Sequence, residues 1–183
     1  DLGSIYATEG NYSLFYTGSN GTVSQIGYAN SSDGITWTKQ NSGKKVLSAA
    51  TFDVGHLNTP FVRYNGTQYE MWYHGRNKST GASIGYATSS DGDNWVRANN
   101  GNALLGPGAT GKFDDREVYN PVIINNGTHD LMWYSGVKTM TGNRLRIGLA
   151  TSENGSSTWT RANSGDSILD FGSAGKFDDY HLS

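Results

Sequence analysis

The chain has 183 residues, which is enough for one domain with a sizeable core. It contains 25 glycines, only 3 prolines and 12% aromatic residues, mostly tyrosine, and this mixture is typical of short β-strands joined by tight turns. The net charge of -2 with scattered lysines and arginines predicts no nucleic-acid partner, no apolar run approaches the roughly 18 residues of a membrane span, and the lack of cysteine excludes disulfides and thiol chemistry.

Three kinds of strand recur in the same order along the chain. An aromatic strand that ends in glycine is found at Leu14–Gly18, Met71–Gly75 and Met132–Gly136. A strand of the form Ile-Gly-Tyr/Leu-Ala, with the turn that follows it, is found at Ile26–Gly34, Ile84–Gly92 and Ile147–Gly155. A strand with one tryptophan then follows at Trp37, Trp95 and Trp159. Self-similarity of this kind predicts a repeat architecture.

A further strand precedes the aromatic one. It is predicted at Thr59–Tyr64 and Asn120–Asn125, behind a Phe-Asp pair, and an Asn-Gly turn joins it to the aromatic strand. Between the third and fourth strands, Gly34 and its counterparts are expected to supply a positive φ, and Asp33 is expected to cap the backbone of its own turn.

Four-stranded antiparallel units along one chain predict an all-β fold, a β-propeller of four-stranded antiparallel blades with about three blades per chain. The whole chain, 1–183, is one propeller-type domain with approximate repeats at 1–51, 52–112 and 113–176. Residues 177–183 start a further inner strand, and we expect this strand to complete the blade begun by 1–18, because the two segments joined rebuild the repeat within one residue.

Three blades form a half-ring or a fragment, which leaves two arrangements open. The chain is either part of a longer five-bladed protein or half of a homodimeric six-bladed ring assembled head to tail. A homo-oligomer is therefore the expected partner state unless the chain is a fragment.

The order of these motifs, from the Asn-Pro-Val hairpin through MWYSG to IGxATSxDGxxW and a glycine-rich loop, resembles the five-bladed propeller glycoside hydrolases. The nearest are the arabinanase/xylosidase-like enzymes of family 43, with fructosidase and mannoside-phosphorylase relatives. The resemblance covers essentially the whole chain at the level of blades. It implies a protein that acts on or binds carbohydrate of the arabinose or xylose type.

Similar enzymes take an aspartate base or nucleophile from an inner strand, commonly just before proline, and a glutamate acid from another blade. Thr59 and Asn120 occupy the position before proline in this chain. The resemblance therefore leaves the catalytic pattern incomplete and keeps a second reading open, a non-catalytic propeller that binds glycans or serves as a scaffold.

The resemblance places a ligand at the mouth of the central channel, where the inner strands begin. Glu117 is the candidate general acid there, and His56 and His181 are its counterparts in the other copies. Glycoside hydrolysis needs two carboxylates, about 5–5.5 Å apart for retention or about 6.5–9.5 Å for inversion. Asp115 and Asp179 are the candidates for the second one.

Several polar residues near the start of the inner strands are expected to contact the ligand. They are His56, Asn58, His74, Arg116, Asn120 and His181. The alternative for Arg116 is a structural ion pair with Glu117 between blades, and Arg116 there would favour the ionised carboxylate. Recurrence in every copy favours a structural role for the aspartates of the Phe-Asp pairs and for the tryptophan series.

We expect a carbohydrate ligand and no membrane partner, cofactor or metal. Seven Asn-x-Ser/Thr sequons lend weak support to a secreted or cell-surface protein, and they lie at Asn11, Asn20, Asn30, Asn65, Asn77, Asn126 and Asn154.

Overall fold

A computed structural model describes residues 2–8, 10–43, 45–47, 52–139, 144–153, 158–179 and 182. Strands and turns account for this part of the chain, and its only helical segments are three short 3₁₀ turns, η1 (Asn41–Gly43), η2 (Asn99–Gly101) and η3 (Asn163–Gly165). None of the helices in these residues is long and apolar enough to cross a membrane. The predicted all-β fold is confirmed.

The strands form three four-stranded antiparallel units, which are the predicted blades. The first unit contains β1 (Leu2–Thr8), β2 (Asn11–Ser19), β3 (Ser24–Ser31) and β4 (Thr38–Lys39). The second contains β5 (His56–Tyr64), β6 (Tyr69–Asn77), β7 (Gly81–Ser89) and β8 (Val96–Arg97). The third contains β9 (Glu117–Asn125), β10 (His129–Val137), β11 (Leu145–Glu153) and β12 (Thr160–Arg161).

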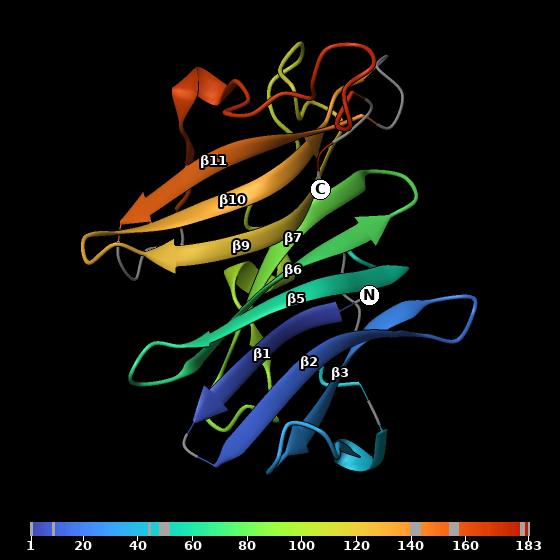
Figure 1. Ribbon diagram of the computed structural model, residues 1–183, viewed down its shortest axis with the longest axis vertical. Coiled ribbons are helices and arrows are strands. Elements are labelled where there is room, and N and C mark those ends of the chain that lie inside the picture. Colours follow the sequence, from blue (N-terminus) through green and yellow to red (C-terminus); the bar gives the residue numbers. More distant parts are fainter. Residues whose placement is uncertain are drawn as a thin grey trace.

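The first strand of each unit is its inner strand. Figure 1 shows β1, β5 and β9 toward the middle of the molecule, with β3 and β11 at opposite outer edges. Neighbouring units meet at the start of the inner strand, where Ser24 of β3 pairs in parallel with His56 of β5. This arrangement gathers the beginnings of β5 and β9, with the ends of the strands beside them, at one edge of the sheets.

The inner strands begin three residues earlier than predicted, at His56 and Glu117, because a bulge lies where the sequence suggested a strand start. The register shifts between Asn58 and Phe61, and a matching shift follows Tyr119. At the bulge, the residue before proline is left-handed, with a φ of 44° at Thr59 and of 51° at Asn120. Such a φ is rare for a β-branched residue and re-aims the side chains around it.

The predicted turn chemistry is confirmed in the first two units. Gly34 and Gly92 have φ values of 73° and 80°. The Oδ1 atom of Asp33 accepts hydrogen bonds from the backbone N–H groups of Ile35 and Thr36, and these bonds lower the pKa of Asp33 well below its usual range. The third turn, at Asn154 and Gly155, lies outside the described residues.

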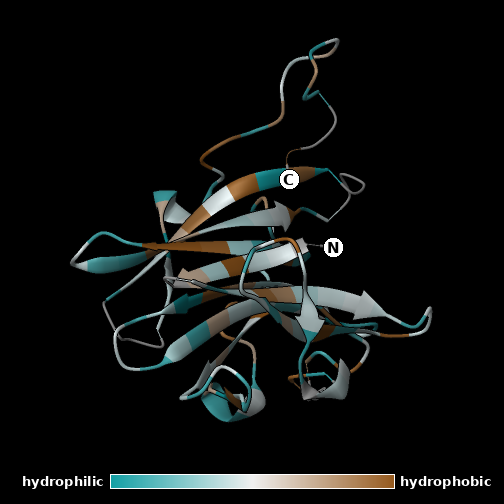
Figure 2. Ribbon diagram, turned by 60° about the horizontal axis from the view of Figure 1, so that its bottom comes forward, coloured by the Kyte–Doolittle hydropathy of each residue, from teal (hydrophilic) through white to brown (hydrophobic). Residues whose placement is uncertain are grey.

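The core lies between the units rather than within one of them. One apolar cluster, around Phe15, Leu57, Val62 and Met71, joins the first unit to the second. Another, built around Trp72, Ile84, Val118, Ile123 and Met132, joins the second to the third. Trp95 and Trp159 pack against these clusters, as expected of the tryptophan series. Figure 2 shows hydrophobic residues concentrated in the strands and hydrophilic ones in the turns.

The Phe-Asp pair before β5 is packed onto its own unit. Asp53 is fully buried, and its Oδ2 atom accepts hydrogen bonds from Arg97 at 2.5 Å and from the Tyr73 hydroxyl at 3.2 Å. A Cβ atom at Gly75 or Gly85 would overlap the pair, so only glycine fits at these two strand positions. We call the four residues that hold the pair, Tyr73, Gly75, Gly85 and Arg97, a Phe-Asp socket.

The third unit has the same socket. Phe113 and Asp114 lie on Gly136 and Gly148, and the fully buried Asp114 carboxylate accepts hydrogen bonds from Arg161 at 2.7 Å and from Tyr134 at 2.9 Å. The structural role expected for these aspartates agrees with both sockets.

Removal of the socket carboxylate tests its contribution to stability. We expect Asp53→Ala to lower the free energy of unfolding by about 3–5 kcal/mol, because Arg97 would keep a buried charge without this partner. Urea denaturation measures the change. The control is Asp166→Ala, which removes an exposed ion pair to Lys112 (3.0 Å) and should cost at most about 1 kcal/mol. Equal losses in the two variants would contradict the structural role of the socket.

Candidate functional site

A pocket of about 260 Å³ with both charged and apolar lining residues lies where the second and third units meet. Residues from the ends of β6 and β10, the start of β11, and the start of β9 with the residue before it line it: Arg76, Arg116, Glu117, Tyr119, Asn120, Val137 and Leu145. The sequence predicted three of these residues, Arg116, Glu117 and Asn120, as site candidates. The bulge before Pro121 places Asn120 on the same pocket as Glu117.

Glu117 is the centre of the pocket's charge. The residue is only 3% exposed, yet its carboxylate lies 3.3 Å from Arg76 on one oxygen and 3.3 Å from Arg116 on the other. The Tyr119 hydroxyl donates a 2.6 Å hydrogen bond to Oε2. The expected ion pair of Arg116 with Glu117 is thus present, and Arg76 extends it across the junction between the units.

The hairpin that joins β6 to β7 closes over Glu117. Gly81 has a φ of 80°, and a Cβ atom there would lie 2.9 Å from Cγ of Glu117 and 3.1 Å from the carbonyl oxygen of Arg116. Glycine therefore satisfies two demands, the left-handed backbone and the close approach to the carboxylate. The hairpin backbone at Gly81 therefore lies directly against the Glu117 side chain.

His74 lies beside the pocket in the interior of the protein. Its Nδ1 atom is 2.8 Å from Oγ1 of Thr59, and its ring meets the edge of the Tyr119 ring with centroids 5.1 Å apart. Burial lowers the pKa of His74 to about 4, and the positive charge of Arg76 and the nearby His56 act in the same direction. The imidazole is therefore neutral at physiological pH and supports Tyr119.

The other predicted ligand contacts are more dispersed. His56 lies across β5 and β6 from Arg76, and its Nδ1 atom is 2.8 Å from the Ser24 hydroxyl. Asn58 is half-buried and pairs with His74 across the same two strands. His181 lies outside the described residues. None of His56, Asn58 and His74 lines the pocket.

Asp115 and Asp179 hold turns in the loops before the inner strands. The carboxylate of Asp115 accepts hydrogen bonds from the backbone N–H groups of Gly111 at 2.7 Å and Thr139 at 2.6 Å, and these bonds lower its pKa. Asp179 accepts a bond of 2.6 Å from the N–H group of Gly175. Neither aspartate lines the Glu117 pocket.

Four residues of the pocket were missed by reasoning from the sequence, the apolar Val137 and Leu145 and the polar Arg76 and Tyr119. Arg76 directly follows the glycine that ends the aromatic strand. The third copy has Val137 at this position, so one copy carries a charge there and the other does not. Tyr119 lies two residues after Glu117 on β9, and side chains two apart on a strand share a face. If Glu117 is taken as the centre of the site, the sequence alone points to both Arg76 and Tyr119.

No protein-family model matches this sequence, and no curated protein matches it either. Solved structures do. Zg3597, a family 117 glycoside hydrolase from the marine bacterium Zobellia galactanivorans, superposes with a TM-score of 0.73 at 15% identity, over 89% of this chain and 55% of that one. The β-1,2-mannobiose phosphorylase from Listeria innocua gives 0.68 at 18% identity, over 90% and 44%. The Bombyx mori family 32 β-fructofuranosidase BmSUC1 gives 0.70 at 15% identity, over 91% and 37%.

These similarities confirm the predicted fold, a glycoside-hydrolase-like propeller. The chain spans about half of the length of the first of these proteins and less of the other two. The fructosidase and phosphorylase relatives named from the motifs are represented among them, whereas membership of family 43 stays a prediction. At these identities the likeness concerns the fold alone.

The buried histidine predicts a pH dependence of stability. Because His74 binds its proton more weakly when folded, with a pKa of about 4 against 6.5 for the free side chain, the unfolded chain takes up more protons between these values. We expect stability to fall as the pH drops from about 6.5 to about 4, by up to roughly 3 kcal/mol from this group. Above about pH 6.5 the contribution is constant.

Urea denaturation of His74→Gln at several pH values tests this. We expect the variant to lose that part of the pH dependence, whereas the control His129→Gln, whose side chain is exposed, should behave as the unchanged chain does. An identical pH profile for His74→Gln and the unchanged chain would contradict the assignment.

Proposed function

We propose that this chain is part of a carbohydrate-binding propeller of the glycoside-hydrolase type, and that a sugar binds in the Glu117 pocket. The observation that carries the proposal is a glutamate whose side chain is only 5% exposed, lines a pocket, and is contacted by two arginines and a tyrosine hydroxyl. Burial of a carboxylate beside a cavity is costly to stability unless it is paired and hydrogen-bonded, and a carboxylate with polar neighbours at a cavity suits a ligand with many hydroxyl groups.

The chemistry of the pocket fits a single sugar ring. Neighbouring hydroxyls of a sugar donate to a carboxylate and accept from guanidinium groups, and Asn120 supplies both a donor and an acceptor. Val137 and Leu145 give the pocket an apolar wall for the C–H groups of the ring. Its volume of about 260 Å³ is below the roughly 300–1,000 Å³ of pockets for drug-sized ligands.

We further propose that the ligand is a pentose of the arabinose or xylose type. The small pocket and the motifs that resemble the arabinanase/xylosidase-like enzymes support this choice. Zg3597 and the other two matched structures support a carbohydrate ligand in general.

Binding without hydrolysis is the form of the proposal that the site favours. A general acid delivers its proton to the leaving group through one carboxylate oxygen, and both oxygens of Glu117 already have protein partners, Arg76 on one and Arg116 with the Tyr119 hydroxyl on the other. Glycoside hydrolysis also needs a second carboxylate, and among the described residues that line the pocket Glu117 is the only acidic one. Hydrolysis with Glu117 as acid remains the competing proposal, supported by the fold.

Calorimetric titration with arabino- and xylo-oligosaccharides tests binding. We expect Glu117→Gln to weaken the affinity about tenfold or more, because it removes charge-assisted hydrogen bonds worth roughly 1.5–3 kcal/mol. Glu153→Gln is the matched control, an exposed glutamate at the end of β11 that should leave the affinity unchanged. Equal affinities for all three proteins, or no binding of either sugar series by the unchanged chain, would refute the proposal.

Aryl α-L-arabinofuranosides and β-D-xylosides separate the two forms. We expect the unchanged chain to bind these sugars and to release no phenol from them. Turnover that disappears in Glu117→Gln would instead favour the general-acid role.

A further inference from the structure

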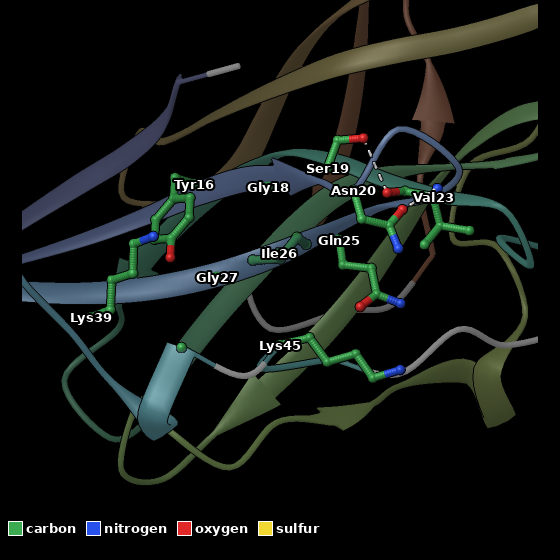
Figure 3. Close-up of a pocket in the computed structure, with 11 residues that line it drawn as sticks. Tyr16, Gly18, Ser19, Asn20, Val23, Gln25, Ile26, Gly27, Lys39 and Lys45 are labelled. Carbon is green, nitrogen blue, oxygen red and sulfur yellow. Dashed lines mark hydrogen bonds between the residues drawn. The ribbon is translucent and has the colours of Figure 1, made fainter.

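The first unit contains a counterpart of the Phe-Asp socket in which no phenylalanine and aspartate of the described residues lie. Its residues correspond by strand register to those of the filled sockets: Tyr16 to Tyr73 and Tyr134, Gly18 to Gly75 and Gly136, Gly27 to Gly85 and Gly148, and Lys39 to Arg97 and Arg161. In place of a phenylalanine and an aspartate, a pocket of about 270 Å³ lies there, lined by all four residues. Figure 3 shows Tyr16 and Lys39 together on one part of this pocket, with Gln25 and Lys45 on another.

Gly18 is the clearest sign that the socket is built for an occupant. In the filled sockets, a Cβ atom at Gly75 or Gly136 would overlap the bound phenylalanine and aspartate. A Cβ atom at Gly18 would meet only Tyr16 at 3.7 Å and the Gln25 carbonyl at 4.0 Å, which are ordinary contacts. The described residues therefore put no steric demand for glycine on this position.

The charge of the socket is complementary to an aspartate. Arg97 and Arg161 pair with the buried carboxylates of the filled sockets. Lys39, at the corresponding position, is exposed, and Lys45 adds a second positive charge to the same pocket.

The same chain carries a third Phe-Asp pair, Phe177 and Asp178, which no socket among the described residues holds. Phe177 is fully exposed, whereas Phe113 is 6% exposed. Its turn already has the bound form, because the N–H group of Gly172 donates to the Asp178 carbonyl at 2.9 Å just as that of Gly108 donates to Asp114 at 3.0 Å.

In chain order, this third pair comes after the third unit, whereas the empty socket belongs to the first unit. The N–H group of Leu182 donates to the carbonyl of Leu145, at the start of β11, with a distance of 3.1 Å. The contact matches the pairing of Ser24 in β3 with His56 in β5, where a unit meets the next inner strand. Leu182 thus lies beside the start of β11 as an inner-strand residue of a further unit would.

Apolar residues are exposed on both end units where their counterparts are buried. On the third unit, Leu169 is 53% exposed, whereas Leu105 in the corresponding isolated bridge is 4% exposed. On the first unit, Ile5 is 55% exposed, whereas Val62 at the corresponding register is 4% exposed. The face with Leu169 and the face with Ile5 correspond to the two surfaces that pack against each other where neighbouring units meet within the chain.

We propose that the empty socket of the first unit binds Phe177 and Asp178 of a second copy of this chain, with Lys39 as the partner of the carboxylate. The exposed face of the third unit of one copy then covers the exposed face of the first unit of the other. Two such contacts close a head-to-tail pair, and a single one extends into a chain of copies if the rotation does not close. This inference is independent of the sugar proposed for the Glu117 pocket.

Light scattering after size-exclusion chromatography, over a range of concentrations, tests the proposal. We expect the unchanged chain to reach twice the mass of one copy or more. Gly18→Leu fills the socket with a side chain that its backbone accepts, and Phe177→Ala removes the occupant, so each should raise the dissociation constant about tenfold or more. Thermal unfolding of the two variants checks that the copies remain folded.

Two controls distinguish the specific contact from nonspecific association. An equimolar mixture of Gly18→Leu and Phe177→Ala restores one intact contact per pair and should associate more tightly than either variant alone. The combined charge reversal Lys39→Glu with Asp178→Lys should regain affinity lost by either change alone. A single-copy mass at every concentration would overturn the proposal and leave a segment of another chain as the occupant; association unaffected by Gly18→Leu would overturn it as well.

Discussion

The carboxylates of Asp53 and Asp114 are fully buried, and each is held by an arginine from the last strand of its own unit and by a tyrosine hydroxyl from the second. A buried charge is tolerated only when it is paired and hydrogen-bonded, so this one interaction fixes the position of the chain before β5 and before β9. The positions of the inner strand and of the hairpin, which follow along the chain, depend on it. The long loops between units can vary in sequence because the pair, rather than the loop, determines where the next strand starts.

The left-handed residue before proline determines what the inner strand presents to the pocket. It interrupts the ladder after Asn58 and after Tyr119, and the strand resumes with a shifted register. Core residues such as Val62 and Ile123 then face the preceding unit, whereas Glu117 and Tyr119, before the bulge, face the pocket. The bulge therefore lets one strand contribute to the core with its second half and to a polar site with its first. Thr59, which is strained at this position, is retained with its hydroxyl near the His74 ring.

The fold was predictable because its signals are local and occur in several copies. The Asn-Gly turns, the Ser-Asp-Gly turns and the aromatic strands each specify a piece of backbone without reference to the rest of the molecule. The start of the inner strands was missed because the pairing of His56 with Arg76 depends on a bulge, which alternation of side chains does not reveal. Arg76 was missed for a related reason: it reaches Glu117 across a junction between units, and its role is absent from either unit's own pattern.

The position at the start of the inner strand shows how a site arises within such a framework. His56 and Glu117 occupy it in the second and third units, and both side chains reach into the preceding unit. His56 meets a serine hydroxyl there, that of Ser24, at 2.8 Å from its Nδ1 atom. Glu117 meets Arg76 instead and needs Gly81 in place of a larger residue, so a change of one residue in the strand is matched by changes in the neighbouring hairpin. A pocket with its own charge pattern therefore forms at one junction while the other junction keeps a simpler contact. Ion pairing and ligand binding are compatible at such a position, because the arginines that stabilise Glu117 are themselves half-exposed and free to donate to a hydroxyl-rich ligand.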